Sequence, residues 1–181
     1  MMATATVKVW DPLLRVFHWG LATAIVTAWL TADELQNLHE FAGYAAGSLI
    51  VVRLVLGIVG SRYARFGQFI RSPRQTWLYA SDMLRHREAR YLGHNPLGAA
   101  MVVLLIALTA AVALTGWLQT TDAYWGVEWV EETHETLANI FLVAIPLHVL
   151  GVIHASRRHR ENLVAAMITG RKRAASGSDL G

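Results

Sequence analysis

The sequence contains no cysteine, and only 16% of its 181 residues are charged. Without thiols the chain forms no disulfide, holds no iron–sulfur cluster and offers no thiolate to zinc or to a substrate. Soluble domains are about 45–50% apolar and about 25% charged, whereas this chain is 54% hydrophobic. The composition therefore argues against an ordinary soluble enzyme, and it excludes intrinsic disorder, which requires low hydrophobicity.

Long apolar runs are present instead. A membrane-spanning helix takes about 20 mostly apolar residues, and four segments qualify. Residues 97–118 carry no charge, whereas 15–32, 38–60 and 134–155 each contain a few charged or histidine residues. We expect an all-α integral membrane four-helix bundle, formed as one domain by residues 1–173.

Two further segments have patterns of their own. Residues 72–91 begin with Ser-Pro and are amphipathic, which predicts a short interfacial helix between the second and third spans. Residues 174–181 (AASGSDLG) are small and polar, which predicts a flexible C-terminal tail.

The charges of the connecting segments alternate in sign along the chain. Segments 1–17, 61–96 and 155–181 hold 15 of the 16 basic residues, whereas 33–40 and 119–135 hold eight acids and no base. Because basic loops stay on the cytoplasmic side of a membrane, we expect both termini in the cytoplasm and both acidic loops in the periplasm. The net charge of +3 averages over the two sides, so we expect no nucleic-acid partner.

Four of the eight histidines fall at matching depths in three of the predicted spans. His134 and His148 are separated by about 3.9 helical turns, so they share one helix face at a distance of about 21 Å. His39 begins the second span at its outer end, and His18 lies near the inner end of the first span. The spacing predicts an outer pair, His39 with His134, and an inner pair, His18 with His148.

Two histidines that face each other across a bundle suit a six-coordinate iron porphyrin. Small residues near these histidines leave room for a porphyrin face: Gly20, Gly43, Gly47, Ala138 and Gly151. A single histidine would more simply form a hydrogen bond between helices, but that role does not require four at paired depths. A proton relay stays open, and zinc is disfavoured because neither pair has an obvious third ligand. We expect two hemes per chain.

Two arginines lie near the predicted hemes. Arg53 falls inside the second span on the same face as His39, about 21 Å deeper. A buried guanidinium there suits a heme propionate, with hydrogen bonds to carbonyls of neighbouring helices as the alternative. Arg15, one turn before His18, serves a propionate in the same way or anchors the helix at the inner surface.

The remaining histidines have less defined roles. His94, in Gly-His-Asn-Pro before the third span, is either a turn residue at a helix start or part of a quinone or proton site. His154 lies about 120° from His148 around the helix, and we expect it to be an interfacial polar group. His86 and His159 lie among arginines and are expected to be solvated.

Several motifs occur together in the order of a known family. They are Trp10-Asp11-Pro12, Arg15, His18-Trp19, Leu38-His39, Gly43, Arg53, Tyr91–Gly98 (YLGHNPLG), Thr115-Gly116, His134-Glu135, His148-Val149 and Arg160–Leu163 (RENL). This ordered set resembles the prokaryotic cytochrome b561 family, which includes the b-type cytochrome subunits of nickel–iron hydrogenases. Two features depart from the family pattern. Leu56-Gly57 stands where the family often has Trp-Gly, and the connection between the first two spans is short.

The resemblance implies heme b bound by His18, His39, His134 and His148 in a bacterial inner membrane, with electron exchange with ubiquinone or menaquinone. The first hypothesis is therefore electron transfer across the bilayer between the quinone pool and a periplasmic redox partner, such as a c-type cytochrome. The eight outer acids suit a basic partner, or they only complement the positive-inside pattern.

Two other functions stay open. A superoxide:quinone oxidoreductase is an activity of the family, but it would need a cationic entrance at the outer side, where this chain carries only acids. A membrane anchor and electron acceptor of a hydrogenase-like dehydrogenase is compatible with the same residues. We interpret the chain as an electron-transfer protein, with quinone-linked oxidoreductase activity and a homo-oligomer as further options.

Overall fold

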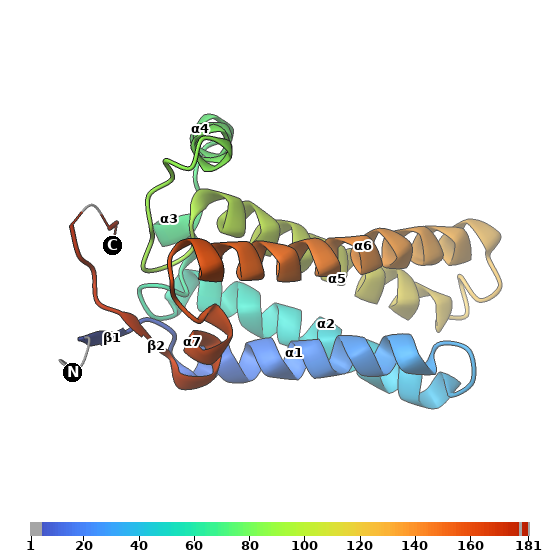
Figure 1. Cartoon of the computed structure of the whole chain (residues 1–181). Helices are drawn as coiled ribbons and strands as arrows, with labels where there is room; N and C mark the ends of the chain where they lie inside the picture. The colour runs from blue at the N-terminus through green and yellow to red at the C-terminus, as the bar shows by residue number, and fades with distance from the viewer. Residues whose placement is uncertain (1–4, 178, 181) are drawn as a thin grey trace. The chain divides into compact units, whose positions relative to one another are not determined.

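The computed structural model describes residues 5–177 and 179–180. Within them, four helices are long and apolar enough to cross a membrane (Figure 1): α1 (Pro12–Thr31), α2 (Gln36–Val59), α5 (Pro96–Gln119) and α6 (Glu128–Arg158). Their bounds agree with the predicted spans to within a few residues, except at the start of α6. The predicted all-α membrane fold with four spans is confirmed.

Helix α6 begins at Glu128, well before the apolar run that predicts it. Its first turn holds Glu128 and Glu131, and its last turn holds Arg157 and Arg158. Acids at the N-terminus and bases at the C-terminus of a helix interact favourably with its dipole. These charges stabilise helical turns on both sides of the apolar segment. Hydropathy did not predict those turns, because it detects only the length of helix that lies among lipid tails.

The long helices contribute residues to two compact units. Unit 1 comprises the residues up to Arg15, Leu56–Val103 and the residues from Leu147 onward, and unit 2 comprises Val16–Val55 and Leu104–Pro146. Unit 2 therefore contains the two acidic connections, between α1 and α2 and between α5 and α6. Unit 1 contains the basic segments, together with the short helices and strands.

The packed centre of unit 2 is small and apolar. Leu108 of α5 and Phe141 and Ala144 of α6 are buried, and four partly buried residues pack against them: Ile25, Leu105, Leu137 and Ile145. Trp29 and Val143, in contrast, are more than half exposed. Outward-facing apolar side chains are expected of helices whose solvent is lipid, because burying them against one another gains little there.

Unit 1 contains three short helices outside the spans: α3 (Phe66–Phe69), α4 (Pro73–Leu84) and α7 (Leu163–Thr169). Helix α4 is the predicted interfacial helix, and a capping box between Ser72 and Gln75 starts it. It ends at Leu84 rather than at residue 91. His86 has a φ of 55°, a left-handed conformation that a right-handed helix cannot include, so the basic residues after Leu84 form a loop.

A two-stranded sheet and a backbone pairing hold the end of the chain. Strands β1 (Thr6–Lys8) and β2 (Arg171–Arg173) are antiparallel. Beyond β2, the Leu180 amide donates to the Arg90 carbonyl at 2.8 Å, and the Leu180 carbonyl accepts from the Leu92 amide at 2.9 Å. Residues 174–181 were expected to form a flexible tail, but Leu180 is held by these two backbone hydrogen bonds. Residues 178 and 181 lie outside the described residues.

An ionic cluster in unit 1 joins this C-terminal segment to the loop after α4. The buried Arg90 donates to Glu161 at 2.8 Å and to Asp179 at 2.6 Å. Glu161 also accepts from the Arg173 amide at 2.8 Å and lies 3.3 Å from Nζ of Lys172. Burial raises the pKa of Glu161, but the hydrogen bond from Arg90 and the charge of Lys172 outweigh burial and hold the pKa below its ordinary value.

Glu161→Gln is expected to lower the free energy of unfolding by about 3 kcal/mol, because it leaves two buried cations with one carboxylate fewer. The folded-state pKa of Glu161 is lowered, so its stabilisation is complete above the ordinary value of 4.5 and is lost as the pH falls through the folded value. Thermal unfolding of the detergent-purified chain across this acidic range measures both effects.

Glu132→Gln is the matched control, since Glu132 is exposed on α6 and forms no ion pair among the described residues. It is expected to change stability by less than about 0.5 kcal/mol. Equal melting temperatures for the two variants at neutral pH would contradict the role given to Glu161.

Candidate functional site

Two of the four predicted histidines come together in unit 2. His39 lies in the first turn of α2 and His134 in the second turn of α6, and their ring centroids are 6.2 Å apart at an interplanar angle of 78°. Both side chains are half-buried. The outer pair that the sequence predicts is therefore a pair of neighbouring rings in the structure.

The Nδ1 atom of each ring is held by oxygens of a neighbouring helix. Nδ1 of His39 lies 2.8 Å from the carbonyl oxygen of Ala28, in the last turn of α1. Nδ1 of His134 lies 3.1 Å from the carbonyl oxygen of Val112 and 3.1 Å from Oγ1 of Thr115. Because a carbonyl only accepts, Nδ1 of each ring carries the hydrogen and donates it. The Nε2 atoms then keep their lone pairs for a metal.

Thr115 and Gly116 allow the His134 ring to pack closely against α5. The Thr115 hydroxyl donates to the Ala111 carbonyl at 2.9 Å, which leaves its oxygen free to accept from His134. A Cβ at position 116 would lie only 3.1 Å from Cε1 of His134. Glycine at position 116 therefore lets the ring reach the Val112 carbonyl.

The separation of the rings fits two imidazoles on one iron. A metal–imidazole bond is about 2.0–2.1 Å, so two imidazoles that would hold one iron have ring centroids no more than about 6.4 Å apart, and the observed 6.2 Å is within this limit. Among the described residues, no group of three or more histidines and acids could hold a metal ion. A Cβ added at Gly43, one turn after His39, would meet no atom within 4 Å, which leaves space beside the pair.

His18 and His148 belong to different units. His18, on α1 in unit 2, is half-buried, and its ring meets the Trp19 ring edge-on at 5.1 Å between centroids. His148, on α6 in unit 1, is also half-buried, and a Cβ at Gly151 would meet no atom within 4 Å. The inner pair stays a prediction from the sequence.

The two predicted arginines differ in their surroundings. Arg53 on α2 is 2% exposed, so its charge is buried. Arg15 in unit 1 donates through Nη1 to the carbonyl of Ile168 near the end of α7, and Gly170 leaves room for its side chain. Two roles were expected of Arg15, and this contact between α1 and α7 is the kind that the anchoring role requires.

His94 and His154 also differ. The ring of His94 lies between those of Trp10 and Phe69, at centroid distances of 4.8 and 4.7 Å. The next residue, Asn95, accepts from the Gly98 amide at 2.7 Å and starts α5. His94 is therefore part of a packed turn at a helix start, whereas His154 is exposed on α6.

Four apolar helices and a pair of neighbouring imidazoles from two of them are features of membrane cytochromes of the b type. The chain belongs to the prokaryotic cytochrome b561 family, whose model matches residues 9–170. The family predicted from the motifs is therefore confirmed.

Relatives of the chain carry a more specific name. It is 26% identical to a probable Ni/Fe-hydrogenase B-type cytochrome subunit of Rhodobacter capsulatus, with 92% of this chain aligned to 81% of the relative. It is 23% identical to the subunit of the same name from Rhizobium leguminosarum bv. viciae, over 92% of this chain and 89% of the relative. No solved structure gives a significant match.

The protein is thus a multi-pass prokaryotic membrane protein that binds heme b and transfers electrons, related to the cytochrome subunits of hydrogenases. In the sequence, Thr115 and Gly116 stand out only as part of the family pattern. Their contacts with His134 depend on how α5 packs against α6, which residue spacing within one helix does not report.

Thr115→Val is expected to raise the midpoint potential of the heme that His134 is predicted to bind. The variant removes an acceptor for Nδ1–H of His134, which makes the ring a weaker electron donor. For a one-electron couple, the loss of one hydrogen bond of about 1 kcal/mol corresponds to a shift of up to about 40 mV. Spectroelectrochemical titration of the purified protein measures it.

Thr109→Val supplies the control, because Thr109 is also a buried threonine of α5 whose hydroxyl donates to a helix carbonyl, that of Leu105. Its hydroxyl forms no hydrogen bond with a histidine among the described residues, so its variant should leave the potentials unchanged. The same shift in both variants would show that the Thr115 hydroxyl has no specific effect on the redox centre.

Proposed function

We propose that the protein carries electrons across the membrane through two b hemes, one bound by His39 and His134 and the other by His18 and His148. The observation that carries the proposal is the facing pair in unit 2, in which helix oxygens hold both Nδ1 atoms. The second pair is supported by the sequence, since His148 lies on the same face of α6 as His134, about 21 Å along the axis.

Heme supplies the one-electron iron couple when bound, and the residues of this chain set its environment. His39 and His134 are oriented by their Nδ1–H hydrogen bonds, so that Nε2 is the coordinating atom of each. Thr115 and the Val112 carbonyl make the His134 ring a stronger donor. The apolar core around Leu108 and Phe141 excludes water from the packed centre of unit 2, which favours the less charged state of a bound iron centre.

Arg53 is proposed to bind a propionate of the second heme. Its guanidinium is buried on α2, about 21 Å from His39 along the helix, at the depth predicted for the inner pair. A buried arginine retains its charge and pairs best with a carboxylate through two hydrogen bonds. A propionate is such a carboxylate.

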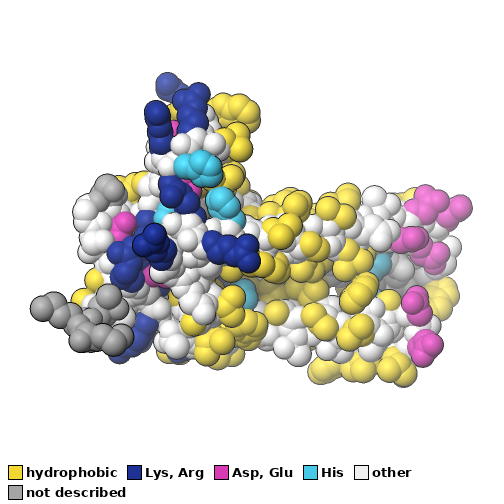
Figure 2. Space-filling model, in the orientation of Figure 1, with side chains coloured by type: hydrophobic (Ala, Val, Ile, Leu, Met, Phe, Trp, Pro, Cys, Tyr) yellow, Lys and Arg dark blue, Asp and Glu magenta, His cyan; other side chains and the backbone are white. Residues whose placement is uncertain are grey.

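The charges support an orientation with both termini in the cytoplasm. Arg53 is the single basic residue of unit 2, and all other lysines and arginines belong to unit 1. The acids of unit 2 gather at its end in Figure 2, and seven of the eight are exposed: Asp33, Glu34, Asp122, Glu128, Glu131, Glu132 and Glu135. This asymmetry is what the positive-inside pattern requires.

The proposed electron donors and acceptors are the quinone pool and a periplasmic redox partner. The exposed acids suit a protein with a basic surface, such as a c-type cytochrome. A second candidate follows from the relatives named as hydrogenase cytochrome subunits, in which the partner would be a dehydrogenase docked on the membrane. Superoxide is disfavoured as a substrate, because exposed acids repel an anion.

His39→Ala and His134→Ala are each expected to lose the same one of the two hemes. Both remove a ligand of one iron, and the other pair stays intact. The pyridine hemochrome assay should fall to one heme per chain in each variant, with similar residual spectra. His154→Ala, which removes an exposed histidine of α6, is the control and should retain two. Retention of both hemes in His39→Ala would contradict the proposed pairing.

The role of Arg53 is tested in the same background. Adding Arg53→Leu to His39→Ala should lower the midpoint potential of the remaining heme, because a positive charge near iron favours the reduced state. Arg53→Lys keeps the charge and should shift the potential less. If the double variant His39→Ala/Arg53→Leu had the same midpoint potential as His39→Ala, Arg53 would not lie near the remaining heme.

The partner is tested by the salt dependence of electron transfer. Oxidation of the quinol-reduced protein by a basic cytochrome c should slow steeply as ionic strength rises, because screening weakens attraction between exposed charges. Glu131→Gln/Glu132→Gln should reduce this dependence, and Asp82→Asn on the basic side should not. A rate insensitive to salt, together with a dehydrogenase that co-purifies, would favour the second candidate.

A further inference from the structure

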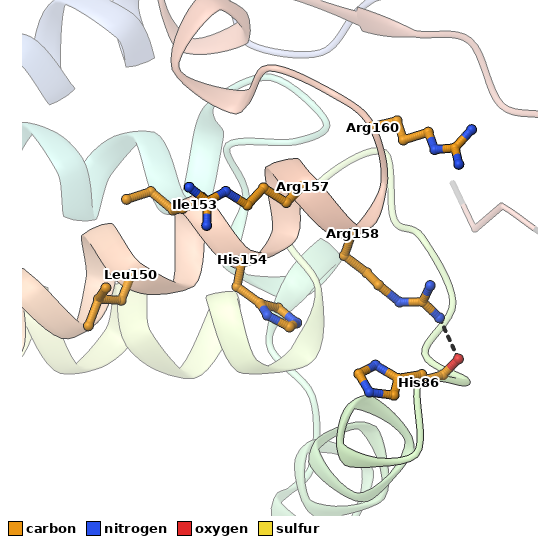
Figure 3. Close-up of a pocket in the computed structure, with 7 residues that line it drawn as sticks. All are labelled: His86, Leu150, Ile153, His154, Arg157, Arg158 and Arg160. Atoms are coloured by element: carbon orange, nitrogen blue, oxygen red, sulfur yellow. Dashed lines mark hydrogen bonds between the residues drawn. The ribbon is translucent and has the colours of Figure 1, made fainter.

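Unit 1 contains a groove that the electron-transfer proposal does not use. Its volume is about 720 Å³, and three arginines and two histidines contribute to its walls (Figure 3): Arg157, Arg158, Arg160, His86 and His154. The histidine His86 comes from the loop after α4, and the other four come from the end of α6 and the residues after it. The volume lies in the range of small-molecule sites, about 300–1,000 Å³.

The groove changes from apolar to basic along one face of α6. Leu150 and Ile153 line it toward the middle of the helix, and His154 and Arg157 follow toward its end. These positions have the spacing i, i+3, i+4, i+7, which places them on a single helix face. The change takes place over about 10 Å, so the groove offers an apolar wall and a cationic wall to the same ligand.

Two of the three arginines carry exposed charges. Arg157 and Arg160 are exposed, and neither forms an ion pair with an acid among the described residues. Arg158 is engaged, because its Nε donates to Glu88 at 2.8 Å and its Nη2 donates to the His86 carbonyl. The groove therefore carries a net positive charge. Arg158 connects the end of α6 to the loop after α4.

The backbone around the groove adopts an unusual conformation. His86 and Arg160 have φ values of 55° and 50°, and within the described residues they are the non-glycine residues with positive φ. Such conformations are rare for residues with a side chain and tend to occur at functional sites. Both positions line this groove, which indicates that its shape is maintained against a local backbone preference.

We propose that this groove binds the head group of an anionic phospholipid. Phosphate oxygens would accept from the guanidinium groups of Arg157 and Arg160, and the first methylenes of an acyl chain would lie along Leu150 and Ile153. Guanidinium groups match phosphate geometry through paired hydrogen bonds, and basic pockets at the ends of membrane helices are suited to such head groups. A quinone is neutral, so its binding would gain little from the positive charge of these arginines.

This inference is independent of the heme ligands and of the redox partner. It rests on the membrane location of α6 and on the groove alone, and the orientation proposed above only assigns the site to the cytoplasmic leaflet. The lipid would fix the height of the end of α6 in the membrane, where His148 lies on the same helix.

Binding is measured by native mass spectrometry on the full, heme-loaded chain after detergent delipidation. Phosphatidylglycerol should bind, and phosphatidylcholine with the same acyl chains should bind much more weakly. Arg157→Gln/Arg160→Gln should weaken phosphatidylglycerol binding about 30-fold, from the contribution of two basic side chains near the surface. Should this double variant lose heme, Arg157→Gln alone should weaken binding about fivefold.

Arg71→Gln/Arg74→Gln is the matched control. It removes the same charge from exposed arginines of unit 1 that do not line the groove, and phosphatidylglycerol binding should be unchanged. An equal loss in the control would show a general surface attraction, and would overturn the proposal. The proposal would also be overturned if phosphatidylcholine bound as tightly as phosphatidylglycerol, or if inorganic phosphate bound as tightly as the lipid. Displacement of one lipid by one quinone would overturn it too.

Discussion

The redox centre proposed in unit 2 depends on the hydrogen bonds that the Nδ1 atoms of His39 and His134 donate to helix oxygens. Within a membrane bundle there is little water to satisfy an imidazole N–H, so an unbonded one costs several kcal/mol. The carbonyls of Ala28 and Val112 meet this requirement. In doing so they also fix the tautomer and the direction of each ring, so the bond that makes the histidines tolerable in lipid is the bond that prepares Nε2 for iron.

Polar chemistry is divided between the two units. In unit 2 the polar contacts of rings and hydroxyls are few, as at Thr115, and one charged side chain, Arg53, is buried. The acids of unit 2 lie in the connections or in the first turns of α2 and α6. Unit 1 instead contains a dense ionic cluster around Arg90 and Glu161 and most of the basic residues. Such a division suits a protein whose one part lies among lipid tails while the other meets head groups and water.

Much of this arrangement could be predicted from the sequence. Hydropathy located four spans, and the spacing of His134 from His148, with His39 and His18 at matching depths, predicted the pairs, of which His39 with His134 lies side by side in unit 2. The contacts of Thr115 and Gly116 could not be predicted, because they arise between helices. Strands β1 and β2 are too short for a pattern to show, and Leu180 pairs with distant backbone although its surrounding sequence is typical of a free tail.

Heme stoichiometry tests the central claim most directly. A pyridine hemochrome assay on the purified chain, referred to its concentration by amino-acid analysis, is predicted to give two b hemes per chain. Redox titration of the same sample should then resolve two one-electron steps, one for each of the two proposed centres. A value of one heme per chain, or none, would contradict the existence of two histidine-ligated centres.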